Sequence, residues 1–473
     1  MHATWGHERY SRVRLQATLL GSIAVMLLGL SSVDASAQSC PNPPVVTTTS
    51  PKVPSDVCIP DGFNGNPIQF FDDYSWRAFI AMIWPAQKGQ RGIADATQKV
   101  GTTSGPLVFE TLKADWELFQ PGGHAPSAWS EFGGVPAYPC QEQVPNPGAN
   151  DLILASISKF EDLGEAGFGR LVGPIVAQNG TYARYLTNFN EIEFNDIVQK
   201  QWYLRSRLPE GGLVFDNGSL DLKTSWIVME KIPQPERFYM RKAWVMDLNT
   251  GACSQQTVGL VGMHIVQKTL SRPQWIWTSI EHVDNVPPPS AGHAGSFAFN
   301  DGGGSSMPTS NPIPFPPPLQ PPAPFNIVRI KPIDPSTRNT NASYRSALAG
   351  TIWANYELVM TQWPLKAGAP TVPGTPPNTF PGTAFPFEGG FANTTMETFD
   401  QKAIATGCMA CHNLAMRKTD FLWSLEINAF PQQPSVLTPR GPSPGPRVLT
   451  ATPSSIPLQQ LKALMQSATG QAE

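Results

Sequence analysis

Two cysteines and a histidine stand in one short run near the C-terminal end of this chain, in the order Cys408, Met409, Ala410, Cys411 and His412. The pattern is C-x-x-C-H: two thiols one helical turn apart can add across the vinyl groups of a haem, and the adjacent histidine can ligate its iron. The sequence therefore predicts one covalent haem c bound by Cys408, Cys411 and His412, with His412 as the proximal iron ligand.

Two other kinds of site use a C-x-x-C pair. A thioredoxin-like dithiol would follow a strand in a βαβ unit, and half of a zinc site would need two further ligands elsewhere in the chain. The histidine directly after Cys411 favours haem over both of them.

The residues around the motif carry helix signals. Thr394 to Glu397 is a capping-box pattern, which predicts a helix leading to the motif along the face Met396, Phe399 and Ala403. After a proline-rich stretch, Ser455 and Pro457 can open a second helix, whose apolar face holds Leu458, Leu461 and Met465.

With these two helices around its motif, the segment from Thr394 to Thr469 resembles the class I cytochrome c domain. The resemblance covers roughly a sixth of the chain and implies a small, mostly α-helical haem-binding fold. That family usually takes a methionine from the loop between the motif and the last helix as sixth ligand, but no methionine lies between Met416 and Met465 here. The longer region before this segment resembles that of large, poorly characterised bacterial single-haem cytochromes, which implies no particular activity.

The sequence leaves the distal iron ligand open among Met465, His264 and His282. Met416 follows His412 by four residues, so on a continuing helix it would lie on the same side of the haem as the proximal ligand. Met465 could reach the iron if the last helix folds over the haem, although a methionine in register with Leu458 and Leu461 is more often part of a core.

His264 and His282 lie in two strands expected on either side of a turn at Ser271. A hairpin centred there would put both histidines on one face of the sheet, about four residues or roughly 13 Å apart, so only one of them could bind the iron. Trp275 and Trp277 would then lie on the opposite face, in a core.

The first 37 residues have the pattern of a Sec-type signal peptide. Arg9, Arg12 and Arg14 precede an apolar run from Leu19 to Leu30, and an A-x-A site ends at Ala37. The run is too short to span a bilayer comfortably. The residues just before Cys40 lack the leucine that precedes the cysteine in lipoprotein signal sequences. We therefore expect cleavage after Ala37 and a periplasmic protein.

The four remaining cysteines, Cys40, Cys58, Cys140 and Cys253, are scattered along the chain. An oxidising compartment predicts disulfides among them, with three possible connectivities, of which Cys40 with Cys58 closes the shortest loop.

Composition limits the partners of the chain. A formal net charge of -3 gives no electrostatic reason to bind nucleic acid or an anionic membrane surface. No later stretch approaches 18 apolar residues, so no integral membrane protein is expected after signal cleavage. The 49 prolines and 40 glycines among 473 residues predict long irregular connections.

The hydrophobic patterns predict an α+β fold. A large N-terminal domain, residues 38–365, carries an antiparallel sheet and a Pro/Gly-rich insertion at 286–325. A linker at 366–390 then leads to a small, mostly helical cytochrome c-like segment at 391–473. Helical spacing covers Trp76 to Trp84, Leu107 to Phe119 and Phe189 to Tyr203. Strands are expected at 174–177, 182–186, 225–229, 238–246, 258–268 and 274–282.

Two local expectations accompany this fold. Asn179-Gly180 predicts a type I′ hairpin turn between the first two strands. Arg184, Glu191 and Glu193 are expected at the solvated surface.

The function that these patterns favour is one-electron transfer by a single haem, with a redox partner protein. Because the loop methionine is missing, a second hypothesis is a haem enzyme, or a gas or redox sensor, with an open distal site. The sequence does not identify a small-molecule substrate for such a site. A third is that the large domain is a separate module that passes electrons to its haem.

Overall fold

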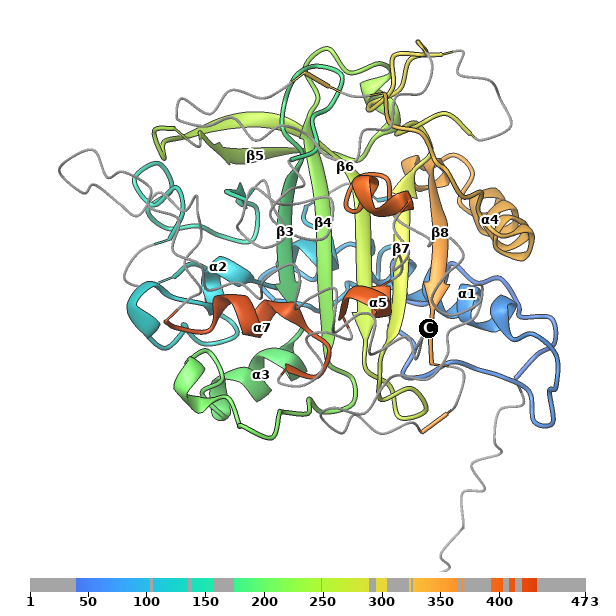
Figure 1. Ribbon diagram of the computed structural model, residues 1–473, viewed down its shortest axis with the longest axis horizontal. Coiled ribbons are helices and arrows are strands. Elements are labelled where there is room, and N and C mark those ends of the chain that lie inside the picture. Colours follow the sequence, from blue (N-terminus) through green and yellow to red (C-terminus); the bar gives the residue numbers. More distant parts are fainter. Residues whose placement is uncertain are drawn as a thin grey trace, which may run out of the picture. The chain divides into compact units, whose positions relative to one another are not determined.

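The computed structural model describes residues 40–102, 105–134, 138–156, 174–247, 249–288, 295–303, 323–324, 326–364, 367–368, 393–402, 408–412 and 419–431. Within them the chain has an α+β fold built on one eight-stranded, largely antiparallel sheet (Figure 1). The expected signal peptide, most of the 286–325 insertion, nearly all of the linker and the helix expected after Ser455 lie outside the described residues.

The strands are β1 (Lys113–Ala114), β2 (Leu152–Leu154), β3 (Arg184–Phe189), β4 (Leu220–Val228), β5 (Met240–Met246), β6 (Cys253–Gln267), β7 (Ile276–His282) and β8 (Tyr356–Gln362). They follow the order β1-β3-β4-β6-β5-β2, and β7 joins β6 to β8. Only the β2–β5 pair is parallel among these pairings. The 15-residue β6 is the spine of the sheet: β4 pairs along one side of it, while β5 and β7 divide the other.

A β-bulge bends this spine. Ser225 of β4 pairs with Gly262 but the next residue, Trp226, pairs with Leu260, so Val261 has no partner on β4. A bulge of this kind increases the local twist and exchanges the faces to which successive side chains point. The curl of the sheet that Figure 1 shows is therefore built into the pairing of β4 with β6.

Two helices cover one face of the sheet. They are α1 (Ile68–Met82) and α4 (Pro335–Ala347), the latter N-capped by the side chain of Asp334. The α1 residue Ser75 bonds to Thr278 at 2.7 Å and Thr361 at 2.8 Å, and Asn341 of α4 bonds to both backbone groups of Leu358. The second pair of bonds covers the open edge of β8, which would otherwise be available for pairing with another strand.

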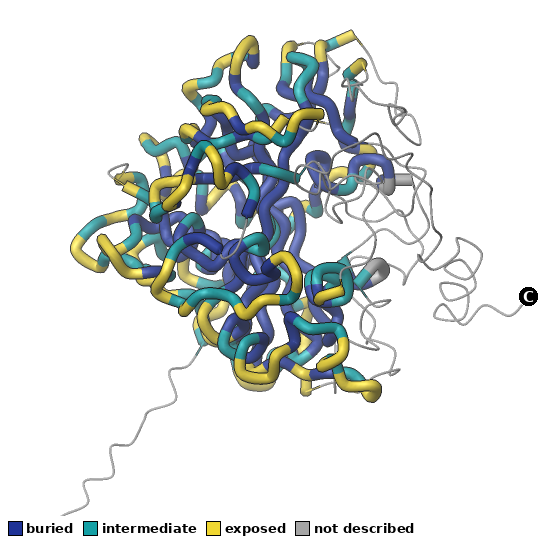
Figure 2. The backbone as a smooth tube through the Cα atoms, turned by 90° about the vertical axis from the view of Figure 1, so that its left-hand side faces the viewer, coloured by how far each residue is buried: buried dark blue, intermediate teal, exposed yellow. Residues whose placement is uncertain are grey.

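The opposite face carries the C-terminal segment. The described parts of it are η6 (Thr398–Lys402), α5 (Cys408–His412) and α7 (Trp423–Asn428), with α3 (Glu191–Gln199) beside them. Figure 2 shows the sheet as the most deeply buried part of the chain. Among the described residues, no helix has the length and apolar character needed to cross a membrane.

Several expectations about elements are confirmed. The predicted strands at 225–229, 238–246, 258–268 and 274–282 all fall within or overlap observed strands. A turn at Asn179-Gly180 does bring Val176 opposite Tyr182, but of its two residues only Gly180 has a positive φ, 79°, so it is not the type I′ turn that was expected. The helix predicted from Phe189 is shorter than expected, because the side chain of Asn190 caps it and the helix ends at Gln199.

Three expectations were wrong. The continuous helix predicted over Leu107 to Phe119 is a 3-10 turn (η1, Val108–Thr111), the short strand β1 and one helical turn (α2, Asp115–Leu118). Glu193 and Arg184, expected at the surface, are 0% and 8% exposed. Burial raises the pKa of Glu193 well above its usual range, with the nearby carboxylates of Asp221, Asp196 and Asp420 adding to the effect.

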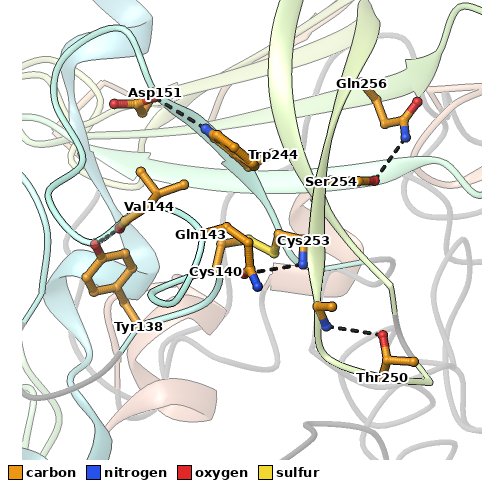
Figure 3. The surroundings of a disulfide bond; sticks show 11 residues. Tyr138, Cys140, Gln143, Val144, Asp151, Trp244, Thr250, Cys253, Ser254 and Gln256 are labelled. Atoms are coloured by element: carbon orange, nitrogen blue, oxygen red, sulfur yellow. Dashed lines mark hydrogen bonds between the residues drawn. A yellow bond between two sulfur atoms is a disulfide. The ribbon is translucent and has the colours of Figure 1, made fainter.

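The scattered cysteines form two disulfides, Cys40–Cys58 and Cys140–Cys253. The second joins two segments 113 residues apart in the sequence, and Figure 3 shows it at Cys253, the first residue of β6. The side-chain oxygen of Gln143 accepts a hydrogen bond from the Cys253 backbone next to it. Of the three connectivities open to the sequence, the tertiary structure selects the one that contains the shortest loop.

Candidate functional site

The C-x-x-C-H motif forms the short helix α5, which lies in front of β6 and β7 in Figure 1. Its helical conformation puts Cys408 and Cys411 one turn apart, with His412 directly after them. Cys408 and His412 are half-buried, and Met409 between the cysteines is 0% exposed.

Met409 connects the motif helix to the sheet. Its side chain belongs to a hydrophobic cluster that includes Trp275 and Trp277 from the start of β7 and Phe421 from the next described segment. Its backbone N–H donates to the side-chain oxygen of Gln362 at the end of β8, at 3.1 Å. The motif is thus attached to the sheet through one fully buried side chain and one backbone hydrogen bond.

The imidazole of His412 is oriented by two neighbours. Its Nδ1 lies 2.7 Å from the backbone oxygen of Phe421, and because a carbonyl only accepts, Nδ1 carries the proton and Nε2 carries the lone pair. The ring centroid lies 4.4 Å from that of Trp277 on β7, at an interplanar angle of 52°.

Helix α7, on the same face of the sheet, is a second attachment of this arrangement to the strands. Leu425 is 0% exposed in the same cluster as Met409, and the Ser424 hydroxyl donates to Asp221 of β4 at 2.7 Å. Beyond the helix, the backbone of Phe430 pairs with Tyr203 and Arg205 at 2.8 and 2.7 Å.

Upstream of the motif, residues 393–402 lie on the same face. The Asn393 side chain donates to Ser279 at 3.1 Å, and the Thr394 hydroxyl donates to Glu281 at 2.7 Å. Thr395 lies over Gly262 of β6, where a Cβ would come within 2.3 Å of the threonine hydroxyl oxygen, so only glycine fits at this position.

The helix predicted to begin at Thr394 takes a different form. Residues 394–396 make a turn, and the 3-10 helix η6 follows from Thr398. Glu397 does accept a backbone hydrogen bond, but from Asn393, one residue earlier than a capping box starting at Thr394 would require. Contacts of this segment with β6 and β7 outweigh the local helix signal.

The histidines considered as distal ligands lie on opposite faces of the sheet, so the expectation of a shared face was wrong. The observed register pairs His264 with Ser279 and Gly262 with Glu281, which puts Val261 opposite His282. The offset between the histidines is then three residues instead of four, and an odd offset reverses the face.

His282 faces α1 and α4, away from the motif. It is 2% exposed, its ring stacks on Phe238 at 3.7 Å, and its two ring nitrogens bond to the Arg237 carbonyl at 3.0 Å and the Asp284 N–H at 3.1 Å. Burial lowers the pKa of His282 to about 4, so the ring is neutral at pH 7.

His264 shares the motif's face. Val266 pairs with Trp277, so His264 lies two residues along β6 from the strand pair that His412 contacts, about 7 Å along the strand. Its Nε2 is 3.6 Å from the carboxylate of Glu397. Trp277, expected on the face away from both histidines, is in fact on the face of His264.

Met360 was missed by sequence reasoning, which considered only methionines after the motif. It pairs with Ser279 on the side of β7 opposite His264, and it is 4% exposed. Only the pairing of β7 with β8 brings it near, and its position in the sequence carries no signal of this. Met465, Met416 and His293 lie outside the described residues, and His124 is exposed, as expected.

The donor set fits a c-type haem. Two cysteines and a histidine share one helix, and the histidine has its Nδ1–H fixed by a carbonyl, so that Nε2 is the nitrogen that carries the lone pair in this tautomer. The neighbouring Trp277, Met409 and Leu422 are each at most 1% exposed and supply an apolar wall of the kind that surrounds haem groups.

Searches of protein-family models, of curated proteins and of solved structures found no match to this chain. The function of the site therefore has to be inferred from its own residues.

Proposed function

We propose that this chain is an exported, periplasmic c-type cytochrome that carries one covalent haem and transfers single electrons to or from a redox partner protein. The proposal rests on the geometry of His412. This residue follows the paired cysteines on one helix and donates its Nδ1–H to the Phe421 carbonyl at 2.7 Å. A histidine whose Nδ1–H is held by a carbonyl is in the tautomer that ligates iron through Nε2.

Each residue has a separate task in this proposal. Cys408 and Cys411 form the thioether links, and His412 is the proximal ligand. A bound haem supplies a one-electron iron couple, whose potential depends on ligand basicity and burial. Trp277 and Met409 exclude water from the proximal side, which lowers the local dielectric around the site.

Among the distal ligands considered, the geometry favours His264. It lies on the motif's face of the sheet, whereas His282 lies on the other face with both ring nitrogens engaged. Met465 stays a candidate on sequence grounds, and Met360 joins it because it occupies the same cross-strand row as His264.

Two further parts of the proposal concern the segment and the compartment. Residues 391–473 would form a shortened version of the cytochrome c fold, and the helix at the motif supports this. Export is supported by the pattern of residues 1–37 and by two disulfides, which persist in oxidising compartments.

The test is expression of the full chain with a cytochrome c maturation system, followed by haem staining after denaturing electrophoresis. We expect a haem-positive band, and none for the Cys408→Ala, Cys411→Ala variant. A haem-negative wild-type band, or haem that survives the double substitution, would refute the proposal.

The visible spectrum of the dithionite-reduced protein with carbon monoxide separates electron transfer from the alternative. Bands that do not move indicate a strong distal protein ligand and favour electron transfer. A prompt shift would favour a haem enzyme or sensor with an open or weakly held distal site.

A further inference from the structure

The carbonyl that orients His412 belongs to an unusual turn. Residues Thr419 to Leu422 form it, and the Leu422 N–H closes it on the Thr419 carbonyl at 3.0 Å. Asp420 and Phe421 have φ angles of 51° and 72°, so two consecutive residues with side chains adopt the left-handed conformation. Such a conformation is unfavourable for non-glycine residues and persists only where other contacts hold it.

The contacts that hold this turn meet at Asp420. Its carboxylate accepts hydrogen bonds from the Lys268 ammonium at 2.8 Å and from the Phe215 N–H at 3.0 Å. Its backbone carbonyl accepts from the indole N–H of Trp275 at 2.9 Å. Three groups from the large α+β domain thus fix the residue directly before Phe421.

The contact between Lys268 and Asp420 is a buried ion pair. The side chains of the two residues are 2% and 0% exposed. Lys268 follows the last residue of β6 and Trp275 precedes the first residue of β7, so both ends of one connection hold the turn. The Lys268 ammonium also donates to the Pro273 carbonyl at 2.6 Å within that connection.

We propose that the buried Lys268–Asp420 ion pair positions His412, by holding the Phe421 carbonyl where it accepts the Nδ1–H, and so tunes the reduction potential of the haem. The inference rests on the proposed function for its effect on potential. Lys268 and Asp420 are positioning residues here, because they act on the ligand through a backbone carbonyl.

The direction of the effect follows from ligand basicity. A hydrogen bond from Nδ1–H to a carbonyl makes the imidazole a stronger electron donor, which stabilises the oxidised iron. Weakening that bond should therefore raise the reduction potential. Removing Lys268 alone would also remove a positive charge, with the opposite effect, so a charge-neutral pair of substitutions gives the cleaner measurement.

The test uses Lys268→Met with Asp420→Asn in the full-length haem-loaded protein. We expect covalent haem to be retained and the reduction potential to rise by about 30 mV. At 59 mV per tenfold change, this is about a threefold change in the equilibrium constant for reduction of the iron. The matched control is Arg241→Met with Glu110→Gln. That pair, at 2.7 Å, is also largely buried, and its further hydrogen bonds are with Leu107, Tyr239 and Asn150.

A second measurement is made without haem, in the Cys408→Ala, Cys411→Ala chain labelled with ¹⁵N-histidine. The tautomer of His412 should move from Nδ1–H toward the Nε2–H form when Lys268 and Asp420 are replaced. If the double replacement does not fold, Asp420→Asn alone serves for the tautomer measurement, because asparagine tolerates a left-handed φ and can still accept from the Phe215 N–H. The tautomer then decides the positioning role, since the loss of one negative charge raises the potential by itself.

The outcomes separate the two proposals. A raised potential and a shifted tautomer support the positioning role. A haem-loaded protein whose potential and tautomer match the wild type would overturn that role and leave the proposed function intact. If the wild-type chain carries no covalent haem but the His412 tautomer still shifts when Lys268 and Asp420 are replaced, the positioning of His412 by the ion pair stands and the proposed function is refuted.

Discussion

Met409 provides a direct test of how the motif helix is attached to the sheet. The side chain is 0% exposed and lies in a cluster with the rings of Trp275, Trp277 and Phe421. Burial of a methionine stabilises a fold by about 1.5–3 kcal/mol through the area removed from water, and the cavity left by truncation adds to the loss. Because large rings in a packed sheet face cannot close the space, we expect Met409→Ala to cost about 3–4 kcal/mol.

The measurement is urea unfolding of the haem-free chain, followed by tryptophan fluorescence, so that haem binding does not contribute to stability. Met240→Ala is the matched control: the same side chain is 38% exposed on β5, and its truncation should change the free energy of unfolding by no more than about 0.5 kcal/mol. Equal and small costs for both variants would refute the docking of α5 on the sheet through Met409.

Three further predictions follow from buried or cross-linked residues. Burial raises the pKa of Asp72 to about 7 from 3.8, so its protonated carboxyl favours the folded state, and this group alone should lower stability by about 4 kcal/mol as pH rises from about 4 to 7. Other buried carboxyls, such as Asp221 and Asp420, also have raised pKa values and add to the slope, so Asp72→Asn should make the slope shallower in urea titrations by its own share, and an unchanged slope would contradict the assignment. Replacing Cys140 and Cys253 with serine should cost about 2–5 kcal/mol, with non-reducing peptide mapping of the wild type as the check on their connectivity. In the haem-loaded protein, His264→Gln should make the reduced bands shift promptly with carbon monoxide while His282→Gln should not, and the reverse result would exclude His264 as distal ligand.

Local sequence determined several features of this protein. The residue types and spacing of Cys408, Cys411 and His412 define the candidate haem site, and they needed no tertiary information because all the ligating groups lie within one helical turn. The position of the Asn179-Gly180 turn, although not its type, and the strands around β4 to β7 were predictable for the same reason, since turn chemistry and hydrophobic alternation act between near neighbours.

The tertiary structure decided what depends on pairing between distant segments. A register different by one residue from the expected hairpin put His264 and His282 on opposite faces, and no pattern within either strand specifies that register. Disulfide connectivity was open for a similar reason, because it depends on which loops the fold brings together.

The environment of His412 shows the same division. The sequence identifies the histidine, but its orientation depends on a carbonyl nine residues later, on Trp277 from the sheet and on a turn that Lys268 holds through Asp420. These contacts join residues up to 152 positions apart, between Lys268 and Asp420. Ligand chemistry is a property of side-chain types, whereas ligand geometry is set by the packing of the C-terminal segment on the sheet.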